Sequence, residues 1–427
     1  MRLRALRAQV ADGDLDRRLN ALYSRTDGGL NGARVRLCAL LDDFAAHFDG
    51  ECGVRLYSSP GRTEIGGNHT DHQRGRTLAA AIDLDIVACA RANADGMVRV
   101  SSKGHPEFSV DLGLPSPIEA ERETPTSLVR GVVSRLSGMG YRIGGFDMCV
   151  ESRVPVGGGL SSSAAFEVLL GVICNDLFCG NRLTPVQIAQ IGQYAENAFF
   201  FKPCGLMDQL ACATGGIAEM DFRSPDAPYV RKLSFDIERA GYALCMIDTG
   251  ASHASLTEDY ASIPREMRAV ARLFGKDALR EVEQDEFWRN LARVRAHAGD
   301  RAALRAMHFF SDDHIAHMEA AALERGDIDE FLSLVNRSGL SSALLLQNLY
   351  SPLKPHEQSI TVAIAAVRRL LDGAGAVRVH GGGFAGAVQA FVPVADITRF
   401  QAGAEALLGV GCCRFMSFRD EGGTIIA

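Results

Sequence analysis

The sequence predicts an α+β protein of two domains. Within each half of the chain, strand-like segments are followed by helical ones, which is typical of the α+β class. The turn-rich stretch Pro225-Asp226-Ala227-Pro228 separates the halves, so we place the domain boundary near residue 235, giving domains 1–235 and 236–427. A length of 427 residues, with 47% hydrophobic and 23% charged residues, suits two or three domains of a soluble globular protein.

The first domain is expected to combine buried strands with two long helices. The basic stretch 1–25 has the pattern of an amphipathic helix and lacks the continuous apolar core of a signal peptide. A long apolar helix is expected from about Ser161, and another after Thr184-Pro185, where a hydroxyl cap precedes proline in the first turn. Strand patterns run from Val54 into a glycine-rich segment and recur at 77–90, 97–100 and 146–156.

The second domain opens with the strand pattern YALCMID at 242–248. From Pro264 to about Gly373 the pattern is mostly helical, with breaks near Pro352 and Pro355. The chain then finishes with three strand-like segments, AVRVH, AVQAFVPV and CCRFMSF.

Composition points to small-molecule partners. A formal net charge of −7 and a pI near 5.9 argue against a nucleic-acid-binding protein or one that binds anionic membranes. The sequence has no run of eighteen or more apolar residues, so no membrane-spanning helix is expected. The eleven cysteines are scattered without a CxxC pair, which suits reduced thiols in the cytoplasm, where we expect this protein to act. The oligomeric state is left open by the sequence.

A glycine and serine run lies between a predicted strand and a predicted helix. It reads VPVGGGLSSSAA from Val154 to Ala165. Free backbone N–H groups and the positive end of the helix dipole would meet there, forming an anion site, and the serine hydroxyls could bind magnesium or phosphate oxygens. The alternative is a serine N-cap after a turn. No Gly-Lys-Ser/Thr follows, so the run is not a Walker A loop.

A second polar segment, GRTEIGGNHTDH, spans residues 61–72. It holds three glycines and eight charged, hydroxyl, amide or imidazole side chains in twelve residues. Such a density of donors and acceptors suits a ligand with many hydroxyl groups. The alternative is a polar turn in which His69 and Asp71 bond to nearby backbone groups.

Four further features have weaker signals. Asp208, in the apolar stretch CGLMDQ, must be hydrogen-bonded, ion-paired or catalytic if it is buried. Glu196 falls off the apolar stripe of its predicted helix, which by itself favours a solvated position. HGGGFAG at 380–386 precedes a strand, so a hairpin or a close backbone approach is favoured over a dinucleotide site. DTGASHASLTEDY at 248–260 could form a pocket rim or serve a core or capping role.

Taken together, these segments resemble the galactokinase branch of the GHMP small-molecule kinases, from Ser59 to nearly the C-terminus. PVGGGLSSSAA is similar to the family's phosphate loop, CGLMDQ to the segment with its catalytic aspartate, and HGGGFAG to its TGGGFGG motif. SHASLTEDY and the following PREMRAVARLFGKDALREV are also galactokinase-like. The matches to the family's GRVNLIGEHTDY motif are Gly61, Arg62, Gly67, His69, Thr70 and Asp71.

The resemblance implies a two-domain GHMP kinase fold with the active site between the domains, and roles for particular residues. Asp208 would accept the proton of a sugar's anomeric hydroxyl, with Arg62 stabilising charge beside it and keeping it ionised. Magnesium would be held by Glu196 and by Ser162 or Ser163. The ATP phosphates would lie on Gly157, Gly158, Gly159, Leu160, Ser161, Ser162 and Ser163, and the sugar on Asn68, His69, Asp71, Gly205 and Tyr260.

The expected activity is therefore ATP- and magnesium-dependent phosphorylation of galactose to galactose 1-phosphate. Several positions depart from the family pattern. Asn68 replaces the glutamate of GEHTDY, His72 replaces its tyrosine, and Glu64 stands where the family has asparagine. A neutral amide donates as well as accepts, so the alternatives are a 1-kinase for N-acetylgalactosamine, galacturonate or L-arabinose, or a sugar sensor without catalysis.

Overall fold

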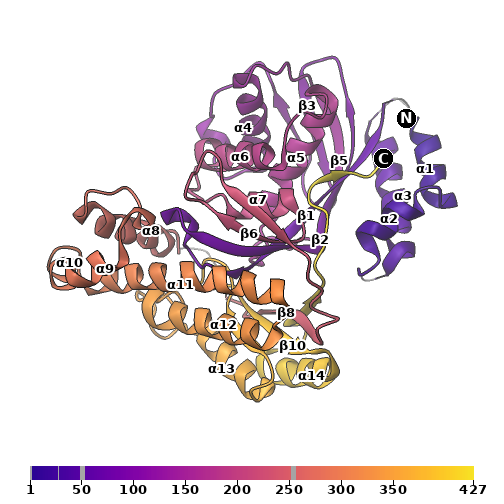
Figure 1. The fold of residues 1–427 in the computed structure, drawn as a ribbon. Helices are drawn as coiled ribbons and strands as arrows, with labels where there is room; N and C mark the ends of the chain where they lie inside the picture. The colour runs from indigo at the N-terminus through magenta and orange to yellow at the C-terminus, as the bar shows by residue number, and fades with distance from the viewer. Residues whose placement is uncertain (1, 27, 49–52, 252–255) are drawn as a thin grey trace.

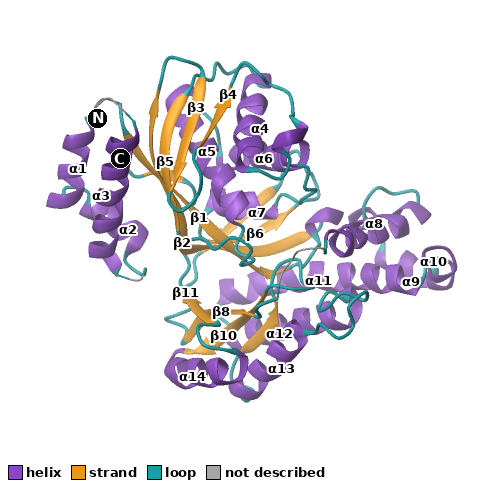
Figure 2. Ribbon diagram, turned by 180° about the vertical axis from the view of Figure 1, so that it is seen from behind, coloured by secondary structure: helices purple, strands orange, loops and turns teal. Residues whose placement is uncertain are grey.

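The computed structural model describes residues 2–26, 28–48, 53–251 and 256–427. Its strands form two sheets, an eight-stranded one built mainly from the first half of the chain and a four-stranded one from the second half (Figure 1). Helices cover the faces of both sheets (Figure 2). The predicted α+β class is confirmed by this arrangement.

The larger sheet has the strand order β12-β1-β2-β5-β3-β4, with β6 paired to β2 and β7 paired to β6. Neighbouring strands are antiparallel except for β3 and β5. The strands are β1 (Arg55–Gly66), β2 (Arg76–Ala92), β3 (Met97–Ser102), β4 (Phe108–Asp111), β5 (Phe146–Ser152), β6 (Ile217–Asp221), β7 (Tyr229–Leu233) and β12 (Thr424–Ile425).

Helices cover both faces of this sheet because its central strands bury alternate side chains on each face. Along β2, Ala88 and Ala90 belong to the main core, whereas Val87 and Cys89 pack under the N-terminal helices. Those helices are α1 (Leu3–Asp12), α2 (Asp16–Tyr23) and α3 (Gly29–His47). The opposite face carries α4 (Pro125–Gly138), α5 (Ser162–Phe178), α6 (Pro185–Ala195) and α7 (Met207–Thr214).

The smaller sheet has the antiparallel order β11-β8-β10-β9. Its residues Leu244 and Phe391 face α12, and Ile247 and Val388 face α13 and α14. The strands are β8 (Tyr242–Asp248), β9 (Ala376–Val379), β10 (Ala387–Pro393) and β11 (Cys413–Met416). The helices are α8 (Thr257–Leu273), α9 (Gln284–Arg289), α10 (Leu291–Ala298), α11 (Asp300–Arg325), α12 (Ile328–Ser341), α13 (Ser359–Leu371) and α14 (Ile397–Leu408).

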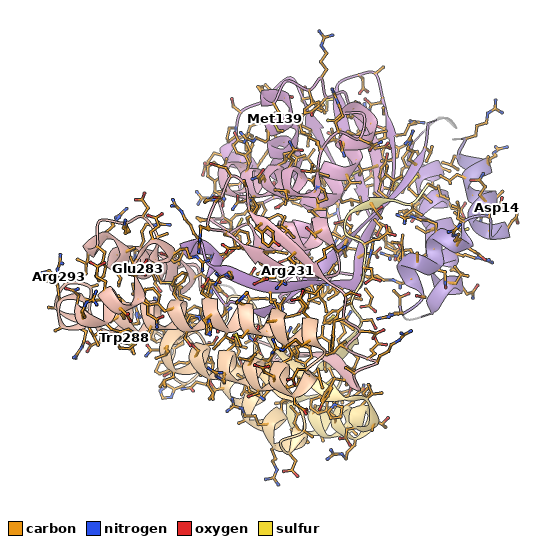
Figure 3. The ribbon with its side chains drawn as sticks, viewed as in Figure 1. Asp14, Met139, Arg231, Glu283, Trp288 and Arg293 are labelled. Carbon is orange, nitrogen blue, oxygen red and sulfur yellow. The ribbon has the colours of Figure 1, made fainter. Side chains whose placement is uncertain are left out.

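The two halves are packed closely against each other. The long helix α11 contacts β1, β2, β6 and β7 of the larger sheet as well as α12 of its own half. Short elements complete the chain: 3₁₀ turns at Asp71–Gln73, Glu119–Glu121, Leu279–Glu281 and Val394–Asp396, and π-helical turns at Glu196–Phe200 and Ser342–Leu346. Met139, just beyond α4, and Trp288, on α9, mark the outer ends of the two halves (Figure 3).

Most of the predicted elements are confirmed, with four differences. The stretch 1–25 forms two helices, α1 and α2, because the chain breaks at Gly13, where φ is 93°. Strand β1 continues to Gly66, so the first half of GRTEIGGNHTDH is strand and not turn. Helix α8 begins at Thr257 and passes through Pro264, the predicted start of the helical region. The strand predicted for 146–156 ends at Ser152, because proline and glycine follow.

The domain boundary near residue 235 stays a prediction. Sheet membership changes between β7, which ends at Leu233, and β8, which begins at Tyr242. However, the end of the chain returns to the larger sheet, where β12 pairs with β1. Among the described residues, no helix combines the length and apolar character needed to span a membrane.

Candidate active site

An ion pair joins Arg62, on β1, to Asp208, in the first turn of α7. Arg62 Nε and Nη2 donate to Asp208 Oδ1 and Oδ2, both at 2.8 Å, and Nη1 donates to the carbonyl of Gly159 at 2.6 Å. Ser161 Oγ donates to Asp208 Oδ2 at 2.5 Å. Burial raises the pKa of Asp208, but the charge and hydrogen bonds of Arg62 and the bond from Ser161 outweigh it and lower that pKa to about 2. Asp208 is therefore an ionised carboxylate.

The glycine and serine run forms a loop between β5 and α5, as predicted. Gly157 and Gly159 both have φ of 75°, in the left-handed region that favours glycine, and Leu160 is buried. Ser161 precedes α5 as its N-cap residue but makes no capping hydrogen bond with its side chain, which goes to Asp208. Ser161 therefore occupies the N-cap position without capping the helix through its hydroxyl, so the alternative of a serine N-cap does not explain this side chain. The loop leaves the first N–H groups of α5 and the positive end of its dipole beside the Arg62–Asp208 pair.

Glu196 lies behind this loop and is buried, which makes the expectation of a solvated Glu196 wrong. The buried stripe of α6 is wider than the apolar pattern suggested, because Ala189 and Gly192 also face the core. Glu196 follows Gly192 by four residues and shares its face. The two small residues let α5 and α7 approach, as a Cβ on Gly192 would lie 3.0 Å from Glu167 Cβ and 3.2 Å from Gln209 Cγ.

Both oxygens of Glu196 have partners. Oε1 accepts from Ser163 Oγ at 3.2 Å and lies 3.2 Å from Lys202 Nζ. Oε2 accepts from Gln209 Nε2 at 2.8 Å, and the same amide donates to Glu167 Oε2 at 2.9 Å. Ser163 and Glu196 thus meet at the start of α5, where Ser162 is the first helical residue.

The pairing of Ser163 with Glu196 suits a magnesium ion. Hydroxyl and carboxylate oxygens are the hard donors that Mg²⁺ prefers, and it is commonly bound by one or two carboxylates together with substrate phosphates. The residues that the structure describes contain no group of three or more His, Cys, Asp or Glu side chains placed to hold a metal ion. A site of this type would therefore depend on the phosphates of a bound nucleotide for further ligands.

Three of the five predicted sugar-binding residues, Asn68, His69 and Tyr260, contact the loop of the β9–β10 hairpin. The predicted hairpin at HGGGFAG is confirmed by the antiparallel pairing of β9 with β10. Three successive carbonyls of its loop accept hydrogen bonds: that of Gly381 from Asn68 Nδ2 at 2.7 Å, that of Gly382 from His69 Nε2 at 3.1 Å, and that of Gly383 from Tyr260 Oη at 2.8 Å. Residues 252–255, in the DTGASHASLTEDY stretch, lie outside the described residues.

Asp71 and Gly205 touch each other. A Cβ atom on Gly205 would lie 1.6 Å from Asp71 Oδ2, so only glycine fits at position 205 in this arrangement. A cavity of about 240 Å³ borders this contact and is also lined by His72, Gln193 and Arg268. A larger hollow of about 560 Å³ lies elsewhere, between the end of α3 and strands β3 and β4.

Asn68 is the predicted sugar-binding residue that the structure places deepest. It has no exposed surface, and its Nδ2 donates to Glu64 Oε1 at 2.8 Å as well as to Gly381. Its Oδ1 accepts from Asn348 Nδ2 at 2.8 Å and from Ser342 Oγ at 3.3 Å. All four hydrogen-bonding positions of this amide are therefore taken by protein groups. A sugar hydroxyl would have to displace one of them.

The sequence analysis did not identify the buried polar groups that hold these segments together. Arg378, on β9, has no exposed surface and donates to Glu64 Oε1 at 3.0 Å. His380 accepts the N–H of Glu64 on Nε2 at 3.2 Å, and His308 donates to the carbonyl of Asn68 at 2.8 Å. A signal was present for Glu64, since in a strand it shares a face with Arg62 two residues before it.

Two protein-family models match the chain. The galactokinase galactose-binding signature matches residues 42–92, and the GHMP kinase N-terminal domain matches residues 127–216. The first match contains the GRTEIGGNHTDH segment with Arg62, and the second contains the glycine and serine loop and Asp208.

Solved structures share the fold over most of the chain. Lactococcus lactis galactokinase complexed with galactose has a TM-score of 0.80 at 24% identity, covering 91% of this chain and 99% of its own. Methanococcus jannaschii mevalonate kinase has a TM-score of 0.61 at 14% identity, covering 86% and 99%. Streptococcus pneumoniae phosphomevalonate kinase, in complex with phosphomevalonate and AMPPNP, has a TM-score of 0.58 at 13% identity, covering 84% and 99%.

These comparisons confirm the resemblance inferred from the motifs. The chain has the GHMP kinase fold, and its residues 42–92 match the galactokinase galactose-binding signature. The roles of individual site residues stay predictions.

Proposed function

We propose that this protein transfers the γ-phosphate of ATP to the anomeric hydroxyl of galactose, giving galactose 1-phosphate and ADP. The observation that carries the proposal is the Arg62–Asp208 pair, held at 2.8 Å directly beside the glycine and serine loop. It combines an ionised carboxylate with a cation at the N-terminus of α5, where phosphate groups bind well. The galactose-binding signature and the likeness to a galactokinase complexed with galactose support this choice of substrate.

In the proposed reaction, Asp208 orients the anomeric hydroxyl and accepts its proton. The hydroxyl oxygen forms a bond to the γ-phosphorus, the bond from that phosphorus to the bridging oxygen breaks, and ADP leaves with the electron pair. A carboxylate with a pKa of about 2 is a weak base, so the proton moves late, as suits a loose transition state in which positioning matters more than base strength. Arg62 keeps Asp208 ionised and adds positive charge beside the loop.

The loop from Gly157 to Ser163 would hold the nucleotide phosphates through backbone N–H groups and hydroxyls. Ser163 and Glu196 would hold a magnesium ion, which neutralises charge on phosphate oxygens when it is bound. His69, Asp71, Gly205 and Tyr260 would hold the sugar. Because burial, with the nearby His72, lowers the pKa of His69 to about 3, its ring is neutral and its Nε2 carries the proton given to Gly382.

A related sugar is the second candidate substrate, and Asn68 is the observation that favours it. In place of the family's glutamate, an amide whose hydrogen bonds all go to protein groups stands beside the predicted sugar residues. A sugar site without that carboxylate offers the sugar hydroxyls different hydrogen-bond partners than the family's site does, so it would discriminate differently between related sugars. N-Acetylgalactosamine, galacturonate and L-arabinose are the sugars to compare.

The test is ADP release from purified protein with ATP and magnesium, using galactose, N-acetylgalactosamine, galacturonate, L-arabinose or glucose in separate reactions. We expect the highest kcat/KM with galactose. Turnover of another sugar with negligible turnover of galactose would overturn the choice of galactose while retaining the kinase. Binding of galactose with no turnover of any sugar would overturn the kinase and favour a sugar sensor.

A further inference from the structure

Lys202 has no role in the reaction as derived above, yet its ammonium lies among the charged groups of the site. It follows the π-helical turn Glu196–Phe200 and precedes α7. Its Nζ lies 3.2 Å from Glu196 Oε1, and its backbone N–H donates to the carbonyl of Glu196, also at 3.2 Å. The loop that places Lys202 also carries Gly205, which touches Asp71.

The contacts of Glu196 show on which side of that carboxylate the ammonium lies. Lys202 contacts Oε1, the oxygen that also accepts from Ser163 at the start of α5. The other oxygen, Oε2, points away to Gln209. Lys202 therefore lies on the phosphate-loop side of Glu196.

Lys202 also acts electrostatically on Asp208. The charge of Lys202 is one of the influences that lower the pKa of that carboxylate. Its Nζ is in contact with the predicted metal carboxylate, Glu196. The ammonium therefore adds positive charge to the part of the site where the phosphate chain would bind.

The backbone at Lys202 is restricted, whereas its side chain is free to change direction. Phe201 is in the left-handed region with φ of 63°, and its ring packs against the Arg122 guanidinium at 5.2 Å. Pro203 fixes the next φ near its usual value of about −65°. The side chain of Lys202 is nevertheless 62% exposed, while that of Glu196 is 2% exposed. A long flexible stem on a fixed backbone can move an ammonium by several ångströms without moving the loop.

We propose that Lys202 is a further phosphate-binding residue of this kinase, whose ammonium leaves Glu196 and pairs with the γ-phosphate when ATP binds. Its hydrogen bonds neutralise charge on the transferring group, and it keeps its own proton throughout. The proposal rests on the phosphoryl transfer proposed above but not on the identity of the sugar.

The proposal predicts a difference between nucleotides that a merely structural lysine would not show. Any lysine paired with Glu196 Oε1 would compete with a magnesium ion there, so removing the ammonium should not weaken Mg²⁺ binding in either case. If the ammonium binds the γ-phosphate, its removal should weaken binding of ATP more than binding of ADP, because only ATP has the γ-phosphate.

The test compares Lys202→Met and Lys202→Arg with the control Lys103→Met. Lys103 has the same 62% side-chain exposure and also pairs with a glutamate, Glu151, at 3.6 Å, but it lies just after the end of β3 in the larger sheet. The primary measurement is calorimetric binding of ATP, ADP and Mg²⁺, with the nucleotides titrated in EDTA. Initial rates with the best sugar and circular dichroism accompany it.

We expect Lys202→Met to weaken ATP binding by about tenfold or more, the change that loss of one charge-assisted contact produces, and to weaken ADP binding less. Lys202→Arg should recover part of the ATP affinity, and Lys103→Met should match the parent protein. Equal affinities for ATP in the parent and Lys202→Met proteins would overturn the proposal, as would equal losses for ATP and ADP. If the ATP-selective loss occurs but no sugar is phosphorylated, Lys202 keeps this role and the proposed function fails.

Discussion

Two aspartates of this molecule have similar electrostatics and differ in their solvent access and in the elements that hold them. Asp85, on β2, and Asp208, on α7, are each paired with arginine, and in both the pKa is lowered to about 2 although burial alone would raise it. Asp85 has no exposed surface, whereas the side chain of Asp208 is 31% exposed. A low pKa therefore does not separate an anchoring carboxylate from a reactive one.

The partners of the two carboxylates explain the difference. Asp85 accepts from Arg36 at 2.5 Å, Arg419 at 3.2 Å, Tyr23 Oη at 2.8 Å and Ser58 Oγ at 2.5 Å. These donors come from α3, the C-terminal segment, α2 and β1, so Asp85 ties the N-terminal helices and the chain end to the sheet. Asp208 is held by Arg62 and Ser161 and stays open beside the phosphate loop. Solvent access and a place beside the glycine and serine loop are what make Asp208 the candidate for chemistry.

The largest expected effect comes from Asp208→Asn, which keeps the shape of the side chain but removes its charge and basicity. The kcat with the best sugar should fall by roughly 10²–10⁴-fold, the range that a positioned general base contributes. Binding of ATP should change little, because Asp208 acts on the sugar hydroxyl. The measurements are initial rates and calorimetric ATP binding. A variant that keeps more than a tenth of the parent kcat would show that Asp208 is no more reactive than Asp85.

The matching change, Asp85→Asn, should act on stability and not on the reaction. It removes the carboxylate that pairs with both buried arginines and leaves Arg36 with Glu151 alone, so Arg419 loses its counter-charge, which costs about 3–5 kcal/mol of unfolding free energy. The exposed pair Arg7–Asp42 provides the control, and Asp42→Asn should leave the urea midpoint in place. At a temperature where the Asp85→Asn protein is folded, its kcat should equal that of the parent. A large loss of kcat with an unchanged midpoint would reverse the comparison.

The stability difference between the parent and the Asp85→Asn protein should also depend on pH. The folded pKa of Asp85 lies below its ordinary value of 3.8, so its contribution to stability is fully present above that value and is lost as the pH falls toward about 2. In the Asp85→Asn protein this loss should be missing, and the difference in urea midpoint between the two proteins should shrink below about pH 4.

The sequence predicted the parts of this site that depend on local patterns. The strand, glycine loop and helix around Ser161 and the β9–β10 hairpin follow from apolar periodicity and glycine runs within a few dozen residues. The contacts between segments did not follow from these patterns. Arg62 and Asp208 are 146 residues apart, and only the family resemblance placed them side by side. Glu64 and Arg378 are 314 residues apart, and their contact was not predicted. Helical periodicity also predicted the wrong environment for Glu196. The pattern was judged from the larger apolar residues, and it did not include the part of the buried face that the small residues Ala189 and Gly192 form.

The smallest expected effect concerns a third carboxylate, Glu64. It is buried as Asp85 is, but it contacts Asn68, one of the predicted sugar-binding residues. Burial raises its pKa to about 7, and Arg378 and Arg62 only partly oppose that rise. Its partner Asn68 stands where galactokinases have glutamate, and Glu64 stands where they have asparagine, so the two residue types are exchanged. The variant Asn68→Glu alone places a second carboxylate against Glu64 Oε1 and the carbonyl of Gly381, two acceptors that now receive hydrogen bonds from the amide.

We therefore expect Asn68→Glu to lower the urea midpoint, and Glu64→Asn combined with Asn68→Glu to restore part of it. The coupling should be about 0.5–3 kcal/mol, the range for residues in one hydrogen-bond network. Urea unfolding of the parent, both single variants and the double variant measures it, and the sugar panel follows whether the exchange moves substrate preference toward galactose. If the effects of the single changes simply add, Asn68 and Glu64 do not act as a pair. If they couple, this buried pair supports the fold as Asp85 does, although it lies beside the predicted sugar-binding residues.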